Sequence, residues 1–475
     1  MTIDPVTKSQ HDPKVMVSKR PKVLIVGAGL GGLTLGAILQ KTDIPYEIFE
    51  RAPEMKPLGS AITFTPVIAP FWKQLGMYEE ILAHSKEMTT MELRNENRGL
   101  EYELDFSEGI ELCGAGTYVI PRPVLYDLLM RYVPREHIHF GRKILSTKQG
   151  NNGVMIQCSD GSEFEGDILV GADGAYSAVR KSMYEELSKI SLLPPSDALP
   201  LTFSTVCLVG QTQAFNPSEF PDIASEKCKF MNILGESKPY SYSTFTTAQK
   251  TVCWAVIMYL DAESSKDNDA FRNSEWGPGA AAAMCEQVKD FPIVAGGDKK
   301  LTMGDLIERT PKELISKVML EEKVFKTWHH CRTVLLGDAC HKLSPAGGAG
   351  AANAMHDAVT LANQINALTF HPTINEITAA FKAYCNERQP WVQEAFDSSR
   401  IFKIMTSTSL MGKVVRFCTK HLPAWIQKQA LIKMALNRPQ IAFLPRSADK
   451  GSVKPAVQPS LQCVTPKEET VVLEQ

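Results

Sequence analysis

Several residues near the start of the chain have the types and spacing needed to bind a nucleotide. Gly27, Gly29 and Gly32 directly follow an apolar β-branched run, and Glu50 ends a second strand-like run roughly twenty residues on. In a dinucleotide fingerprint the first glycine allows a tight turn, the second lets the backbone approach a pyrophosphate, and the third lets the helix pack on the strand. Glu50, with Arg51 beside it, suits an unphosphorylated ribose. The segment therefore predicts binding of FAD or NAD; the alternative is a βα loop without a ligand.

Two later segments repeat the order of strand, glycine turn and helix. One contains Asp173-Gly174, and the other contains Gly337-Asp338 followed by a loop with Gly348, Gly350 and Ala351. Either turn alone could be purely structural. If all three strands are parallel in one sheet, however, their turns open at one carboxyl edge and form a composite site for phosphates and a polyol chain. The helix beginning near Ala351 would point its N-terminus at negative charge developing there.

The elements that position these turns are those of an α/β protein. We predict a Rossmann-like FAD-binding domain with an inserted β-rich substrate domain and a C-terminal helical region, because the α/β alternation stops after residue 195 and resumes near residue 328. The expected organisation is a disordered arm (1–20), the first part of the FAD-binding domain (21–195, of which 76–112 contribute to the substrate domain), the β-rich insertion (196–327), the second part of the FAD-binding domain (328–370), the helical region (371–446) and a disordered tail (447–475).

Composition narrows the class of protein. The 475 residues are 44% apolar and 22% charged, with a net charge of −2, which argues against nucleic acid as a partner. The eleven cysteines are scattered, without a CxxC pair or a Cys/His cluster at metal spacing, and predict reduced thiols in the cytoplasm and no metal site. We find no secretory signal pattern and no apolar run long enough to span a bilayer.

The C-terminal region carries an uneven charge pattern. No acidic residue lies between Asp397 and Asp449, whereas apolar residues there alternate with Arg400, Lys403, Lys413, Arg416, Lys420, Lys428, Lys433, Arg438 and Arg446. The pattern is typical of a helical cap with solvated lysines. It is also that of a segment in peripheral contact with an anionic membrane surface.

Taken together, the three glycine turns resemble those of the FAD-dependent aromatic-ring hydroxylase-type monooxygenases, the group built like 4-hydroxybenzoate hydroxylase. The segment Gly337–Pro345 and the overall length are most similar to the fungal FAD-dependent monooxygenases of secondary metabolism. The likeness covers about residues 20–185 and 325–370. Two positions depart from the family pattern, Ala349 where glutamine is frequent and His356 where an acid is usual.

The resemblance implies a role for each candidate residue. Gly27, Gly29, Gly32 and Glu50 would hold the ADP part of FAD, and Arg122, which opens a helix, would also contact FAD. Further contacts would be made by Asp173 and Gly174 near the pyrophosphate, by Gly337 and Asp338 at the ribityl chain, and by Gly348, Gly350 and Ala351 against the isoalloxazine.

The same resemblance implies the chemistry. NADH or NADPH would reduce FAD in a transient visit, since no second GxGxxG unit follows, and O2 would then form a C4a-hydroperoxyflavin that hydroxylates or epoxidises an apolar or aromatic small molecule. Catalytic residues and oligomeric state stay open. His341 is more typical of a structural histidine than of a proton relay, and Tyr240, Tyr242 and Tyr259 are ordinary strand residues. Two alternatives remain, a flavin-dependent reductase of a prenyl-type substrate and a non-enzymatic FAD- or NAD-binding sensor.

Overall fold

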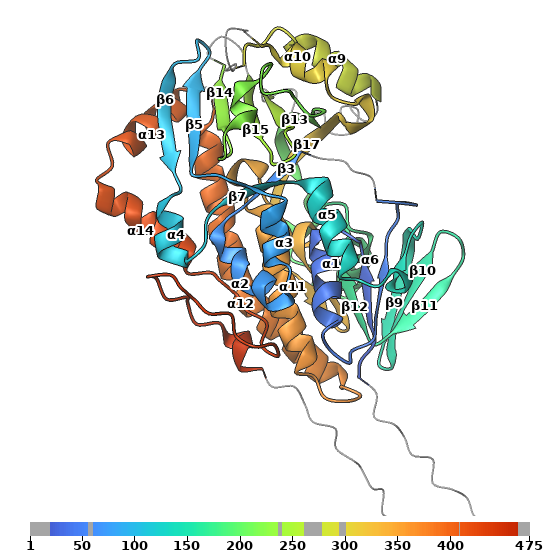
Figure 1. Ribbon diagram of the computed structural model, residues 1–475. Coiled ribbons are helices and arrows are strands. Elements are labelled where there is room, and N and C mark those ends of the chain that lie inside the picture. The colour runs from blue at the N-terminus through green and yellow to red at the C-terminus, as the bar shows by residue number, and fades with distance from the viewer. Residues whose placement is uncertain are drawn as a thin grey trace, which may run out of the picture.

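A computed structural model describes residues 20–55, 60–235, 240–260, 278–293, 301–407 and 409–463 (Figure 1). The expected disordered arm falls almost wholly on residues 1–19, outside the described residues. Arg20, the last residue of that arm, is buried and donates hydrogen bonds to the carbonyl oxygens of Leu368 and Asn366 at 2.6 and 2.7 Å. Arg20 is therefore held by the folded protein.

A six-stranded sheet forms the centre of the first region. Its strand order is β18-β19-β12-β1-β2-β8, and its members are β1 (Val23–Val26), β2 (Tyr46–Phe49), β8 (Ile138–His139), β12 (Ile168–Gly171), β18 (His329–His330) and β19 (Thr333–Leu335). All neighbours in it pair in parallel except β18 with β19. Every residue of β1, β12 and β19 is buried, as expected for parallel strands covered on both faces.

Helices cover this sheet on both sides. They are α1 (Leu30–Leu39), α5 (Arg122–Arg131), α6 (Ala178–Lys189) and α11 (Gly350–Asn366), with α2 (Ala69–Leu75) and α3 (Tyr78–Ala83) farther out. A three-stranded antiparallel sheet lies beside it, formed by β9 (Ile144–Gly150), β10 (Gly153–Cys158) and β11 (Glu163–Gly166). The chain leaves the small sheet at the end of β11, crosses at Asp167, and enters the central sheet as β12.

An eight-stranded sheet forms the second region, at the top of Figure 1. Its order is β20-β17-β13-β16-β15-β14-β5-β6, made of β5 (Thr90–Asn95), β6 (Leu100–Asp105), β13 (Thr202–Gln211), β14 (Phe230–Leu234), β15 (Tyr240–Thr246), β16 (Val252–Tyr259), β17 (Ser316–Val324) and β20 (His341–Lys342). Tyr240 and Tyr242, expected to be strand residues, lie in β15, whose alternating Tyr, Ser and Thr residues give little apolar signal. The helices α9 (Pro278–Val288) and α10 (Met303–Glu308) pack near this sheet.

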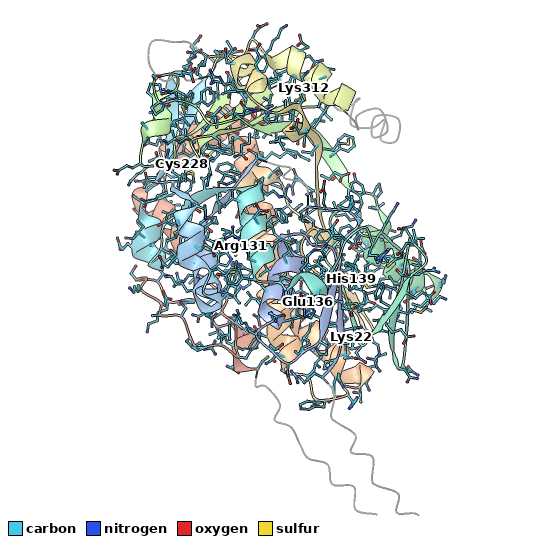
Figure 2. All side chains as sticks on the ribbon, turned by 45° about the vertical axis from the view of Figure 1, so that its right-hand side comes forward. Lys22, Arg131, Glu136, His139, Cys228 and Lys312 are labelled. Carbon is cyan, nitrogen blue, oxygen red and sulfur yellow. The ribbon has the colours of Figure 1, made fainter. Side chains whose placement is uncertain are left out.

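The two regions are joined through the candidate site. Strand β20 follows the third glycine turn directly and pairs with β17 of the eight-stranded sheet. A three-stranded sheet, β3-β7-β4, also lies between them, formed by β3 (Ala61–Phe64), β4 (Lys86–Glu87) and β7 (Tyr118–Pro121). Lys22, which precedes β1, lies low in the molecule in Figure 2, whereas Cys228 lies beside the upper sheet. The carboxyl ends of the parallel strands therefore point toward the eight-stranded sheet.

The C-terminal region is helical, as predicted. Helix α12 (Ile374–Met405) runs from the lower end of the molecule up to the eight-stranded sheet (Figure 1). Helices α13 (Leu410–Lys420) and α14 (Ala424–Ala435) lie at the edge of the molecule, outside β5, β6 and α4 (Glu108–Cys113). No helix within the described residues is both long enough and apolar enough to cross a bilayer.

The tail is ordered further than the sequence predicts. Disorder is expected from residue 447, but residues 447–463 pack on the protein and end in a short 3-10 helix, Pro459–Gln462. Arg438 donates hydrogen bonds to Asp449 and to the carbonyl oxygen of Val453, and the backbone N–H of Ser460 donates to Glu387 at 2.7 Å. The expectation of disorder is therefore wrong for these residues, because side chains outside the segment, those of Arg438 and Glu387, form hydrogen bonds with its polar groups.

Candidate functional site

The first glycine turn joins β1 to α1. Gly27 has a φ of +108°, a conformation that favours glycine, and a Cβ atom on Gly32 would lie 2.0 Å from the carbonyl oxygen of Gly27. Glu50 closes the turn, since its Oε2 accepts the Ala28 N–H at 3.0 Å and its Oε1 accepts the Ala52 N–H at 2.9 Å. The carboxylate keeps further lone pairs that could accept hydrogen bonds from ribose hydroxyls. Arg51 is exposed beside it.

The second turn joins β12 to α6. Asp173 accepts hydrogen bonds from Ser177 Oγ at 2.5 Å and from the Ala178 and Val179 N–H groups at 2.7 and 3.3 Å, so it caps the helix. Burial raises the pKa of Asp173, although these three donors act against the shift. The Asp173 carboxylate therefore has a structural use in addition to any ligand contact.

The third turn joins β19 to the short 3-10 helix Gly337–Ala339. Asp338 is half-buried and forms an ion pair with Lys342 of β20, a partner that the sequence analysis did not identify. Arg180 connects this turn to the second one, because its guanidinium donates to the carbonyl oxygens of Ala339 at 2.7 Å and Ala175 at 2.6 Å.

The three turns meet at one edge of the sheet, since β19, β12 and β1 are direct neighbours. Arg122, at the start of α5, faces the same space. Tyr126, whose hydroxyl accepts a hydrogen bond from Arg122 at 3.2 Å, is the main cause of the raised pKa of Arg122, and Asp338 also contributes. Glu50, Arg122 and Asp338 therefore converge on one region.

The glycines at this edge are of two kinds. At some, such as Gly32, an added Cβ atom would clash with the protein itself, so glycine is needed for packing. A Cβ on Gly350 would meet no described atom within 4 Å, and one on Gly29 would lie 3.9 Å from its nearest neighbour, although neither has a positive φ. Gly174 and Gly348 are also open, with φ values of +81° and +62°. Because the protein itself leaves space at these positions, the edge fits a bulky ligand that approaches the backbone closely, as FAD does in its dinucleotide folds.

A buried ionic cluster supports the third turn from behind. Asp357 on α11 accepts hydrogen bonds from His341 Nε2 at 2.5 Å, from Arg388 Nε at 2.8 Å and from the Gly337 N–H at 3.0 Å. His341, Asp357 and Arg388 are at most 1% exposed. Although burial alone would raise the pKa of Asp357, His341 and Arg388 hold it well below its usual range. The cluster fixes Gly337-Asp338 to α11 and α12.

This cluster also contains the one group of possible metal ligands found within the described residues, Cys340, His341 and Asp357. The Asp357 oxygens already accept three hydrogen bonds, one of them from the permanent cation Arg388. Burial raises the pKa of the Cys340 thiol well above its usual value, so the thiolate form is disfavoured. These contacts are those of a structural ion pair. They also agree with the structural interpretation of His341 made from the sequence.

The tyrosines in the insertion are held by the protein. The hydroxyls of Tyr240 and Tyr242 donate to Gln287 Oε1 and to the carbonyl oxygen of Pro292, and that of Tyr259 donates to the carbonyl oxygen of Thr406 at 3.0 Å. All eleven cysteines are free, and seven are buried. Neither residue type offers an evident catalytic group.

Comparison with known proteins agrees with this geometry. Residues 20–399 match the family model described as an FAD binding domain. The chain belongs to the aromatic-hydroxylase family of FAD-dependent monooxygenases. It is thus an FAD-dependent oxidoreductase, with the Rossmann-like fold and inserted substrate region expected from its sequence.

The relatives are fungal, as the sequence predicts. The FAD-dependent monooxygenase paxM of Penicillium paxilli is 27% identical over 398 residues, covering 80% of this chain and 77% of the relative. The FAD-dependent monooxygenase olcE of Penicillium canescens is 28% identical over 461 residues, covering 92% of each chain. The crystal structure of Klebsiella pneumoniae HpxO complexed with FAD and uric acid has the same fold, with a TM-score of 0.70 at 19% identity over 90% of this chain and 99% of that one.

Proposed function

We propose that this enzyme uses NADH or NADPH as a transient reductant and O2 as co-substrate to hydroxylate or epoxidise an apolar or aromatic small molecule. The observation that carries the proposal is the convergence of three glycine turns and Arg122 on one edge of the sheet, with glycines there that the protein's own packing does not require. FAD, when bound, supplies hydride acceptance and activation of O2.

The chain's own residues would hold the cofactor along this edge. The N-terminus of α1, with Gly27, Gly29 and Gly32, would bind the pyrophosphate through backbone N–H groups, and Glu50 and Arg51 would face the adenosine ribose. Further contacts would come from Arg122, from Asp173 and Gly174, and from Gly337 and Asp338 along the ribityl chain. Gly348, Gly350 and Ala351 would lie against the isoalloxazine, where the N-terminus of α11 stabilises negative charge by about 0.3–1 kcal/mol.

The apolar character of the substrate is inferred from the protein next to the candidate site. A hydrophobic cluster of Met88, Val119 and Cys228, with Ala61, Phe106, Phe230 and Phe245 packed against it, joins the three-stranded sheet β3-β7-β4 to the eight-stranded sheet. A substrate that binds beside this cluster would be held by apolar contact rather than through charge.

The proposal is tested with purified protein carrying its flavin. Under nitrogen, NADH or NADPH should bleach the flavin absorbance, faster in the presence of substrate. In air with ¹⁸O2, members of a panel of apolar aromatics, polyprenyl compounds and phenolic acids should gain one labelled oxygen atom, seen by mass spectrometry. Bleaching with reduction of a prenyl compound and no labelled oxygen would instead support the reductase. Purified protein that binds NAD but no flavin would support the sensor.

A further inference from the structure

Helix α13 is amphipathic, and its apolar side faces solvent rather than the protein. Its side facing the protein carries Gly412, Val415, Arg416 and Thr419, whereas Leu410, Met411, Val414 and Phe417 are exposed. Leu410 is 80% exposed and Phe417 67%. A surface helix normally turns its apolar stripe toward the core and its polar side toward water. Here the apolar stripe faces away from the protein.

Specific contacts maintain this orientation. Arg416 is buried, and its guanidinium donates to the carbonyl oxygens of Met405 and Ser407 at 2.7 and 2.9 Å and forms an ion pair with Glu101 at 3.2 Å. Gly412 allows a close approach, since a Cβ there would lie 2.6 Å from the Ser407 carbonyl oxygen. Rotating the helix to bury its apolar stripe would break these contacts, so the exposed stripe is part of the folded structure.

The exposed stripe continues past the end of α13. Leu422 and Trp425, which lie at the turn into α14, are 38% and 68% exposed. In Figure 1 this turn projects from the edge of the molecule. We define the docking face as Leu410, Met411, Val414, Phe417, Leu422 and Trp425. The opposite side of α14 is anchored, because Leu431, Ile432 and Ala435 pack against Leu112 and Cys113.

Positive charge borders the docking face. Lys413 and Lys420 are exposed on α13, and neither forms an ion pair with any described residue. Lys428 and Lys433 on α14 lie 3.9 Å from Glu111 and 3.0 Å from Glu394, in exposed pairs that contribute little. Because no acidic residue lies between Asp397 and Asp449, the charged side chains that α13 and α14 themselves contribute to this surface are all positive.

We propose that the docking face binds the surface of an anionic phospholipid bilayer. Apolar side chains bordered by lysines, with a tryptophan at the rim, match the layered structure of a bilayer surface, in which acyl chains lie beneath anionic headgroups. A second copy of this chain is a poorer partner, because a two-fold interface centred on α13 would bring Lys413 and Lys420 close to the same lysines of the second copy. This inference does not depend on the proposed reaction.

Flotation of the full-length protein with vesicles tests the proposal. The wild-type protein should float with vesicles of phosphatidylcholine and phosphatidylserine at about 0.1 M salt, and much less with pure phosphatidylcholine or at about 1 M salt, where charge is screened over about 3 Å. The double variant Leu410→Ser/Phe417→Ser should bind at least about ten-fold more weakly, because it removes two large apolar side chains from the contact.

Matched variants distinguish binding through the docking face from non-specific binding to vesicles. Leu192→Ser/Leu199→Ser changes two leucines outside the docking face, each 64% exposed, and should bind like the wild type. Lys413→Gln and Lys420→Gln should each weaken binding about five-fold, whereas Lys41→Gln and Lys181→Gln, elsewhere on the surface, should not. Retained flavin absorbance verifies that each variant is folded.

Three outcomes would overturn the proposal. The first is a wild-type protein that stays in the bottom fraction of the gradient in the presence of phosphatidylserine vesicles. The second is an equal loss of flotation in the docking-face variant and its leucine control. The third is a dimer, measured by light scattering without lipid, that Leu410→Ser/Phe417→Ser abolishes, which would assign the docking face to a second copy.

Discussion

Gly350 offers a direct test of whether the open edge of the sheet is reserved for a ligand. It is the first residue of α11, has no positive φ, and a Cβ there would meet no described atom within 4 Å. Alanine is favoured over glycine in a helix by about 1 kcal/mol. In the protein without FAD, Gly350→Ala should therefore raise the free energy of unfolding by up to about 1 kcal/mol.

The same methyl group should weaken FAD binding. It would stand between the N-terminus of α11 and the expected position of the isoalloxazine. The variant would then lose a hydrogen bond from the helix N-terminus to a charged or polarised group of the flavin, and such a bond contributes about 1.5–3 kcal/mol. We expect FAD affinity to fall roughly ten- to a hundred-fold, measured by flavin fluorescence quenching on titration into apoprotein.

Gly32→Ala is the matched control, because it should destabilise the apoprotein, whereas Gly350→Ala should stabilise it. A Cβ there lies 2.0 Å from the Gly27 carbonyl oxygen, so the apoprotein should lose about 1–3 kcal/mol in urea unfolding. The reasoning is refuted if Gly350→Ala binds FAD like the wild type, or if it destabilises the apoprotein as much as Gly32→Ala does.

Three further predictions concern buried and cationic side chains. Asp357→Asn leaves the Arg388 guanidinium buried without its counter-ion and should cost about 3–5 kcal/mol in urea unfolding, and a loss below about 1 kcal/mol would contradict the role given to the cluster. Burial lowers the pKa of His356 from 6.5 to about 3. The folded protein therefore binds fewer protons, so its stability is intact above pH 6.5 and is lost as the pH falls toward 3. Between pH 7 and 5 the His356 contribution should fall by about 2 kcal/mol, and His356→Phe should remove that part of the slope; an unchanged slope would exclude the histidine as its cause. Arg122→Ala should weaken FAD binding at least about ten-fold and leave the unfolding midpoint of the apoprotein nearly unchanged. The reason is that the Arg122 side chain forms a hydrogen bond with Tyr126 alone among the described residues. Equal losses of FAD affinity and of stability would point to a structural role.

The three glycine turns were readable from the sequence because each is a local event. The apolar run before Gly27 is the strand Val23–Val26, the run that leads to Glu50 is the strand Tyr46–Phe49, and the helix expected near Ala351 begins at Gly350. Backbone conformation at a tight turn depends on the residue itself and a few neighbours, so glycine spacing carries the information. Family membership, and with it FAD, followed from the order of these local signals.

Other features depend on partners far away in the chain, and local patterns could not predict them. The Asp357 cluster needs Arg388 from another helix, and the order of residues 447–463 needs Glu387 of α12. The outward apolar stripe of α13 has the same origin. Its periodicity predicts an amphipathic helix, but contacts of Gly412 and Arg416 decide which side faces the protein. The sequence alone thus determined the three glycine turns and the strands and helices beside them. The packing of polar groups against distant partners decided which faces of the elements meet.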